Sequence, residues 1–165
     1  MKKIRLPTWL IIVLVMVFVL RIPSFFEPFS YGDEMIYLTL GQGIRQKLVL
    51  YRDIHDNKPP LLYFIAALAG NLFWFKVILA IWSIVTIILF WKLVQILFSK
   101  NKKLQKISTA IFAVLTTIPF LEGNIANAEN FMLGPIIAAF LILLSQKLNF
   151  KNLFISGLLF SVATL

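Results

Sequence analysis

Long apolar runs recur along the whole chain and constrain its fold more than any other feature of the sequence. A segment buried in lipid must satisfy its backbone N–H and C=O groups internally, so such runs form helices. Hydrophobic residues make up 60% of the 165 residues and charged residues 14%, which does not suit a soluble surface. The sequence therefore predicts an all-α polytopic membrane protein, a single membrane domain over residues 1–165 with about five transmembrane helices. The runs expected to cross the membrane are residues 7–26, 77–98, 107–121, 131–145 and 153–165.

Two residue counts exclude several kinds of site. The absence of cysteine excludes disulfides, thiolate metal sites and a cysteine nucleophile, and a single histidine excludes a histidine-rich metal site. The net charge of +9 could indicate a nucleic-acid partner, but the basic residues fall in short connections between apolar runs. Their placement indicates membrane orientation instead.

The basic connections predict which side of the membrane each loop occupies. Residues 60–75 are a sixth, ambiguous run: if they cross, the lysine-rich segment 99–106 lies outside, where lysines are rare. If they form a short interfacial or re-entrant helix, every basic connection is cytoplasmic, and we favour this topology. The N-terminus is then cytoplasmic, and all seven acids lie on the extracytoplasmic face of the cell membrane. The basic residues are Lys2, Lys3, Arg5, Lys100, Lys102, Lys103, Lys106, Lys147 and Lys151, and the acids are Glu27, Asp33, Glu34, Asp53, Asp56, Glu122 and Glu129.

The first outer loop, residues 27–76, carries most of the chemical information. From Glu34 onward, apolar residues recur every four positions, which predicts an amphipathic helix. This helix can lie in the headgroup plane with its apolar stripe toward lipid, or the stripe can pack against neighbouring helices. The stripe consists of Ile36, Leu40, Ile44 and Leu48.

Asp33 and Glu34 stand at the start of this helix. A helix N-terminus favours anions, so Asp33 can act as an N-cap and Glu34 as a first-turn acid. Adjacent carboxylates also tend to raise one pKa, which suits a general base or a metal ligand. Both residues are therefore candidate catalytic acids.

The segment YRDIHDNKPPLLY places Lys58 before two prolines. Because proline is tolerated in the first turn of a helix, Pro59 and Pro60 hold Lys58 at a helix mouth, where an ammonium can bind phosphate. Alternatively, Lys58 pairs with Asp53 or Asp56 and extends toward the headgroups. Arg21, near the outer end of the first run, either serves a function there or extends to the headgroups in the same way.

The remaining polar residues of the two outer loops give weaker signals. Asp53, His55 and Asp56 are secondary candidates, because one histidine and two carboxylates within four residues are weak evidence for a metal site, and a nucleophilic triad lacks a convincing serine partner. In the second outer loop, residues 122–130, Glu129 either caps the next helix or joins Asp33 across the outer face. In that second case one acid activates an acceptor and the other positions it or a cation.

The sequence text of these loops resembles the GT-C superfamily of polyprenyl-phosphate-sugar-dependent glycosyltransferases. It is most similar to the branch that contains bacterial aminoarabinose transferases and protein O-mannosyltransferases. The matching segments are YGDEMIYLTLGQGI, LVLYRDIHDNKPPLLYFIAAL and NIANAENFMLG. The similarity spans nearly the whole chain but only the front of such a protein, and the last run ends without a polar flank. We therefore expect the N-terminal portion of a larger enzyme.

The resemblance implies an inverting transfer of a sugar from a lipid-phosphate donor to an acceptor hydroxyl or amine of a glycolipid, polysaccharide or protein. Asp33 matches the catalytic acidic position with Glu34 beside it, Glu129 matches a second outer-loop acid, and Lys58 matches a lysine at the lipid phosphate. We assign Arg21 and Arg52 as further candidates for that phosphate. The family needs no nucleotide sugar, and dependence on a divalent cation differs among its members, so the metal stays open.

The predicted mechanism combines these residues. Asp33 takes a proton from the acceptor as it attacks the sugar, a role worth roughly 10²- to 10⁴-fold in rate. Lys58 stabilises the charge that develops on the departing lipid phosphate.

One alternative function is a non-catalytic lipid-phosphate binder or assembly subunit of the envelope glycan machinery. A transporter is less favoured, because the predicted helix interiors carry almost no ionisable residue.

Overall fold

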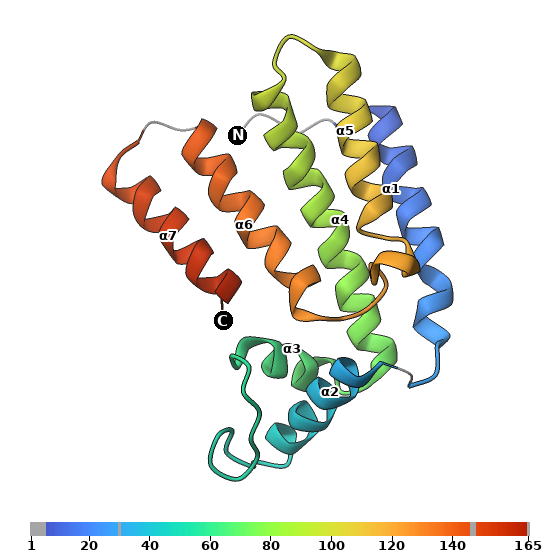
Figure 1. Ribbon diagram of the computed structural model, residues 1–165, viewed down its shortest axis with the longest axis vertical. Helices are drawn as coiled ribbons and strands as arrows, with labels where there is room; N and C mark the ends of the chain where they lie inside the picture. Colours follow the sequence, from blue (N-terminus) through green and yellow to red (C-terminus); the bar gives the residue numbers. More distant parts are fainter. Residues whose placement is uncertain (1–5, 30, 146–147, 165) are drawn as a thin grey trace.

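The computed structural model describes residues 6–29, 31–145 and 148–164 (Figure 1). Predictions that involve Lys2, Lys3, Arg5 and Lys147 lie outside the described residues. The described parts are helical, with no strand and only an isolated bridge between Leu50 and Ile54. The elements are α1 (Thr8–Arg21), η1 (Ile22–Phe26), α2 (Gly32–Arg45), α3 (Leu61–Ala69), α4 (Leu72–Leu97), α5 (Lys102–Leu115), η2 (Pro119–Leu121), α6 (Ala128–Ser145) and α7 (Phe150–Thr164).

Three of these helical segments are long and apolar enough to cross a membrane. They are Thr8–Phe26, Leu72–Leu97 and Ala128–Ser145, of 19, 26 and 18 residues. Helix α7 is apolar but has 15 residues, and α5 has 14. The prediction of an all-α chain with membrane-spanning character is confirmed, with three helices that meet the length of a span.

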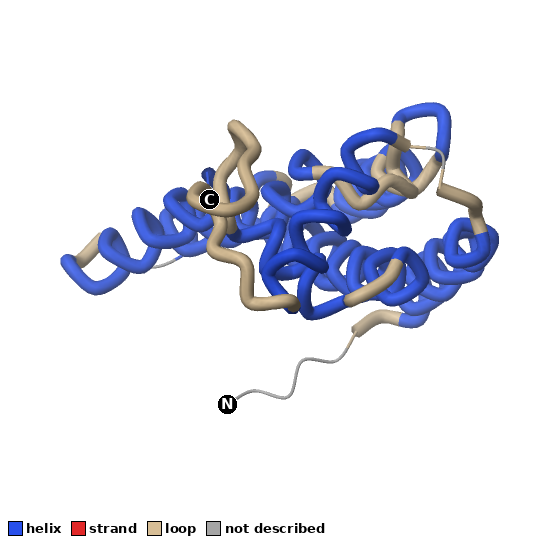
Figure 2. The backbone as a smooth tube through the Cα atoms, turned by 90° about the horizontal axis from the view of Figure 1, so that it is seen from below, coloured by secondary structure: helices blue, strands red, loops and turns tan. Residues whose placement is uncertain are grey.

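The long helices lie side by side, and α2 and α3 lie together at one end of them (Figure 1). Helix α4 contacts α1, α5 and α6, and α7 packs on the far side of α6. The view from below shows the long loop of residues 46–60 projecting beside α2 and α3 (Figure 2). We call the end formed by α2, α3, that loop and residues 122–130 the acidic end. The opposite end, at residues 97–106, is the basic end.

Residues 60–75 do not form one continuous helix, because the chain turns at Gly70. Helix α3 has nine residues, about 13 Å, which is too short to cross a membrane. Gly70 follows it with φ +75°, a conformation that glycine adopts without strain. Asn71 then caps α4, its side chain accepting from the Trp74 amide at 3.0 Å. Because of this cap, α4 begins at Leu72, earlier than the predicted residue 77.

Helix α5 also differs from its predicted limits of 107 and 121. The Asn101 side chain accepts from the Leu104 amide at 2.9 Å, so the helix starts at Lys102. It ends at Leu115, where the Thr116 and Thr117 hydroxyls bond back to carbonyls of the last turn. Pro119 lacks the N–H that would continue the helix and begins η2.

The amphipathic helix exists as α2, and the predicted apolar stripe is correct in part, because Leu40 and Ile44 pack in the apolar cluster shared with α3. Its buried positions include Glu34, Tyr37, Leu40 and Gly41, whereas Ile36 and Leu48 are exposed. The buried face packs against α3, because a Cβ at position 41 would lie 2.6 Å from the backbone nitrogen of Ala67. The packing interpretation therefore describes this helix.

Two apolar clusters hold the fold together. One joins α2, α3 and the start of α4 through buried residues such as Tyr37, Tyr63 and Phe75. The other joins α1, α4 and α5 through residues such as Leu10, Val17 and Trp91. The first cluster positions the charged residues of the acidic end.

Candidate functional site

The adjacent carboxylates of α2 point in different directions. Consecutive helical residues are about 100° apart around the axis, so Asp33 and Glu34 cannot share one face. The side chain of Asp33 is 36% exposed, whereas that of Glu34 is 5% exposed. The two predicted catalytic acids therefore lie in different environments.

Asp33, Tyr37 and Lys58 form a hydrogen-bonded cluster, which we call the surface triad. Lys58 Nζ donates to Asp33 Oδ2 at 2.6 Å and to the Tyr37 hydroxyl at 2.7 Å. The Tyr37 hydroxyl donates to Asp33 Oδ2 at 3.2 Å, and Lys58 Nζ lies 5.0 Å from the Tyr37 ring centroid. Tyr37, one turn after Asp33, was not predicted as a site residue, although its spacing of four places it on the same face.

The surface triad keeps Lys58 charged. Its hydrogen bonds to Asp33 and Tyr37 raise the pKa of Lys58 well above the usual lysine value, despite partial burial. Burial is the main reason that the pKa of Tyr37 is also raised. Of the two predicted partners for Lys58, Asp53 and Asp56, neither pairs with it: its partner is Asp33.

The backbone of Lys58 is held by two tyrosines. Its carbonyl accepts from the Tyr51 hydroxyl at 2.6 Å and from the Tyr63 hydroxyl at 3.3 Å. Tyr63 also donates to Asp56 Oδ2 at 2.7 Å, which lowers the pKa of Asp56. Burial, and then this hydrogen bond, raise the pKa of Tyr63. Asp56, a secondary candidate, thus fixes the turn that leads into α3.

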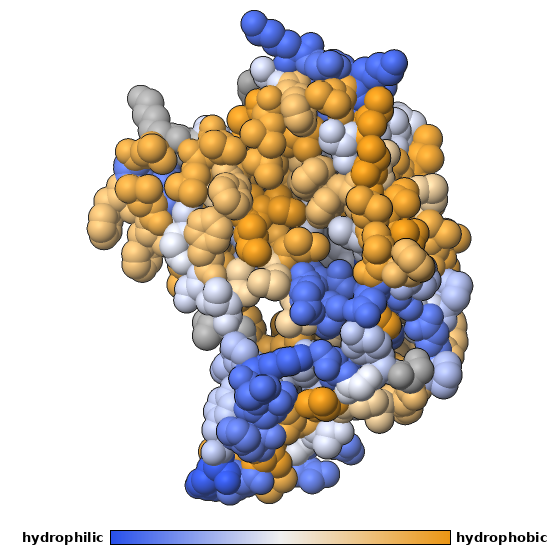
Figure 3. Space-filling model, viewed as in Figure 1, coloured by the Kyte–Doolittle hydropathy of each residue, from blue (hydrophilic) through white to orange (hydrophobic). Residues whose placement is uncertain are grey.

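An apolar groove of about 450 Å³ opens beside the surface triad, between α3, α4, α6 and the end of α7. We call it the α3–α6 groove, and the surface is visibly hollowed there (Figure 3). Lys58 is the one charged side chain among its described lining residues, and Tyr37 lines it too. Its apolar lining includes Leu62, Ile65, Ile78, Trp82, Phe131 and Met132.

Glu34 belongs to a second, buried cluster that joins both outer loops to α4. Lys76 Nζ lies 2.8 Å from Glu34 Oε1 and 3.5 Å from Glu27 Oε2, and it donates to the Asn124 carbonyl at 2.8 Å. The Ala126 amide donates to Glu34 Oε1 at 2.5 Å. The Lys76 side chain is 1% exposed. Glu34 therefore carries a structural ion pair, and we call this set the buried cluster.

Lys76 was missed by the sequence analysis. It stands alone in the apolar run FWFKVILA, between two predicted segments, and a lone ionisable residue in such a run is a signal in itself. A charge placed there requires a partner, and Glu34 is that partner.

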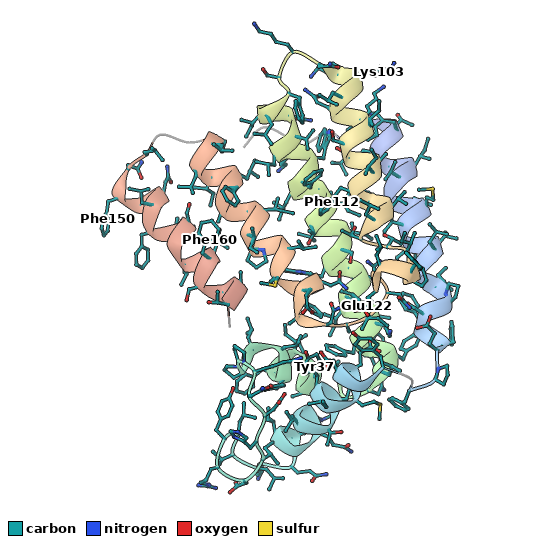
Figure 4. The ribbon with its side chains drawn as sticks, in the orientation of Figure 1. Tyr37, Lys103, Phe112, Glu122, Phe150 and Phe160 are labelled. Carbon is teal, nitrogen blue, oxygen red and sulfur yellow. The ribbon has the colours of Figure 1, made fainter. Side chains whose placement is uncertain are left out.

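Glu129 is exposed in the first turn of α6 and follows Ala128, which lines the groove. Glu122, from the same loop, accepts from the Tyr31 hydroxyl at 2.8 Å. This hydrogen bond, followed by burial and the charges of Glu122, Asp33 and Glu129, raises the pKa of Tyr31 to about 12. Carboxylates of both loops thus gather around Tyr31, at the end where Figure 4 labels Tyr37 and Glu122.

The other predicted residues lie elsewhere. Arg21 is buried and donates to the Thr116 carbonyl at 2.6 Å, which ties α1 to the end of α5. Arg52 is exposed and pairs with Asp53 at 2.9 Å, and the ring of His55 lies edge-on to Tyr51. The ammonium of Lys58 forms hydrogen bonds with Asp33 and Tyr37 and an ion pair with Asp33, and it forms neither with these four predicted residues. Across residues 6–29, 31–145 and 148–164, no group of three acidic or histidine side chains is placed to hold a metal.

Fold and site together define a helical membrane protein with a lysine–carboxylate–tyrosine cluster at the mouth of an apolar groove. Comparisons with protein-family models, curated proteins and solved structures gave no match.

Proposed function

We propose that this chain is the donor-binding part of a GT-C-type membrane glycosyltransferase that uses a polyprenyl-phosphate sugar at its acidic end. The observation that carries the proposal is the placement of Lys58 as the charged residue of an otherwise apolar groove. A lipid phosphate needs an apolar channel for its hydrocarbon chain and a cation for its phosphate, and the apolar groove and the ammonium of Lys58 lie side by side. The helix start immediately after Pro60 adds a positive dipole end at the same place.

The size of the groove supports a lipid ligand. Pockets of roughly 300 to 1,000 Å³ hold small ligands, and this groove of about 450 Å³ falls in that range. Its opening beside α6 and α7 lets a long chain extend into the surrounding lipid. In the proposed topology, five helices cross the membrane and the acidic end faces the extracytoplasmic side.

The surface triad supplies the acid–base step of the proposed reaction. When the donor phosphate binds Lys58, it competes with Asp33 for the ammonium and releases Asp33 Oδ2. Asp33 then accepts the proton of the acceptor group as that group bonds to the anomeric carbon from the opposite side. The bond from the anomeric carbon to the phosphate oxygen breaks, and the lipid phosphate leaves with its new charge stabilised by Lys58.

The two other predicted acids take different roles in this proposal. Glu34 positions Asp33, because its bond to Lys76 fixes the first turn of α2 against α4. Glu129, exposed beside the groove, positions the acceptor. Arg21 and Arg52 take no direct part, since they are engaged by Thr116 and Asp53.

One observation favours a second candidate, a lipid-phosphate-binding subunit without turnover. Asp33 Oδ2 already holds two hydrogen bonds, from Lys58 and Tyr37, so the same geometry serves a binding site that needs no base. The two candidates differ in what they require of Asp33.

The test is transfer of radiolabelled sugar from a polyprenyl-phosphate donor in membranes, with donor retention measured separately by photocrosslinking. Asp33→Asn is expected to reduce transfer by roughly 10²- to 10⁴-fold and to keep donor crosslinking. Lys58→Gln is expected to lose both. Asp53→Asn, an exposed acid of the same loop, is the control and should keep both. Transfer unaffected by Asp33→Asn would remove the assigned base, and crosslinking unaffected by Lys58→Gln would refute the phosphate site.

A further inference from the structure

A second hollow, of about 390 Å³, lies at the basic end, between the start of α1, the end of α4 and the start of α5. It is far from the surface triad: Figure 4 labels Lys103 at this end and Tyr37 at the other. Its side chains combine two tryptophans, two lysines and two amides. They are Trp9, Trp91, Gln95, Lys102, Gln105 and Lys106.

The hollow carries positive charge without a balancing carboxylate. Lys102 and Lys106 are four residues apart on α5, so they lie on the same helix face. Six of the seven acids lie in the segments of the acidic end, and the seventh, Glu27, lies beside them, 3.5 Å from Lys76. Within the described residues, no carboxylate is within ion-pair distance of either lysine. Two ammonium groups beside one cavity favour an anionic occupant.

Both lysines are exposed, and they lie at the edge of the hollow. Lys106 Nζ lies 6.0 Å from the Trp9 ring centroid, a cation–π contact that holds the side chain against the start of α1. Lys102 is the first residue of α5, where the helix dipole is positive. Gln105 fixes the preceding turn by donating to the Phe98 carbonyl at 2.8 Å. The side-chain amide of Gln95 donates to no described residue, so it can donate to an acceptor in the hollow.

We propose that this hollow binds the phosphate of an anionic phospholipid headgroup in the leaflet at the basic end. Lys102 and Lys106 bind the phosphate, and Gln95 donates to its oxygens. Tryptophans at helix ends are typical of the boundary between headgroups and acyl chains. Exposed Ile12 and Val15, further along α1, offer an apolar surface for the acyl chains. This site is independent of the proposed transferase.

The test compares two double variants with the same net charge. Lys102→Gln/Lys106→Gln removes the lysines that line the hollow, and Lys100→Gln/Lys103→Gln removes two exposed lysines of the same end that do not. Each purified chain is titrated in detergent with phosphatidylglycerol or phosphatidylcholine, and retained lipid is measured by native mass spectrometry. Inorganic phosphate is added as a competitor in a parallel series.

The wild type is expected to retain phosphatidylglycerol over phosphatidylcholine, and Lys102→Gln/Lys106→Gln to bind it about tenfold or more weakly. Lys100→Gln/Lys103→Gln should bind like the wild type, and Lys102→Arg/Lys106→Arg should keep binding because the charge remains. Equal losses in the two glutamine variants would indicate unspecific surface charge and overturn the site. Unchanged binding in the first variant, or displacement of the lipid by inorganic phosphate alone, would overturn it as well.

Discussion

The two lysine–carboxylate clusters of the acidic end start from neighbouring residues of one helix and end in opposite environments. In the surface triad, Lys58 and Asp33 are 39% and 36% exposed. In the buried cluster, Lys76 and Glu34 are 1% and 5% exposed. The exposed pair of the surface triad can therefore exchange its partners for a ligand, whereas the pair of the buried cluster is fixed. This difference indicates which pair can meet a substrate and which one holds the loops that form the site.

The largest effect should come from breaking the buried cluster. Lys76→Met leaves Glu34 buried without its cation, and we expect a loss of about 3 to 5 kcal/mol in the free energy of unfolding. Thermal unfolding in detergent micelles measures it. The matched variant Lys76→Met/Glu34→Gln removes the stranded charge and keeps an acceptor for the Ala126 amide, so it should recover part of the loss. A single variant as stable as the wild type would contradict the structural role of the pair.

The next effect concerns the contact that fixes both clusters, the close approach of α2 to α3. Gly41→Ala places a Cβ 2.6 Å from the Ala67 nitrogen, so the helices must separate, at a cost of about 1 to 3 kcal/mol. Gly32→Ala is the control, because a Cβ there meets nothing within 4 Å. Both are compared by thermal unfolding. Equal stabilities of the two variants would show that α2 and α3 can move apart without a loss of free energy of unfolding.

The surface triad should contribute much less to stability. Solvent screens a partly exposed pair, so Lys58→Met is expected to change the free energy of unfolding by no more than about 1 kcal/mol. In the proposed function, the same change removes donor binding. If Lys58→Met lost as much stability as Lys76→Met, the two clusters would not differ in their contribution to folding.

The smallest effect is the pH dependence of the surface triad. The raised pKa of Lys58 means that its contribution to stability is fully present below the unfolded lysine pKa of about 10.4. That contribution is lost as pH rises through the higher folded value. The difference in unfolding free energy between wild type and Lys58→Met should therefore stay constant at neutral pH and shrink at alkaline pH. A difference that grows with alkalinity would contradict the assigned charge state.

The sequence predicted the helical class, and it indicated Asp33 and Lys58 as candidate site residues, because both inferences depend on local patterns. Apolar runs specify helices, and the two prolines before Leu61 predict where α3 begins. The partners were harder to predict, since they depend on packing between distant segments. The sequence predicted that Lys58 pairs with its neighbour Asp53 or Asp56, yet its ion pair is with Asp33, 25 residues away. The predicted stripe was right at Leu40 and Ile44 and wrong at Ile36 and Leu48, because the face that packs on α3 also includes Tyr37 and Gly41.

The long loop between α2 and α3 has a practical consequence for experiments on sidedness. Both of its ends are held by the packed helix pair, and the cost of closing a flexible loop rises only about 0.6 kcal/mol per doubling of its length. A short epitope tag inserted after Gln46, an exposed residue just beyond α2, should therefore leave the helices in place. Antibody labelling of intact cells or spheroplasts would then report directly which compartment this end of the molecule faces.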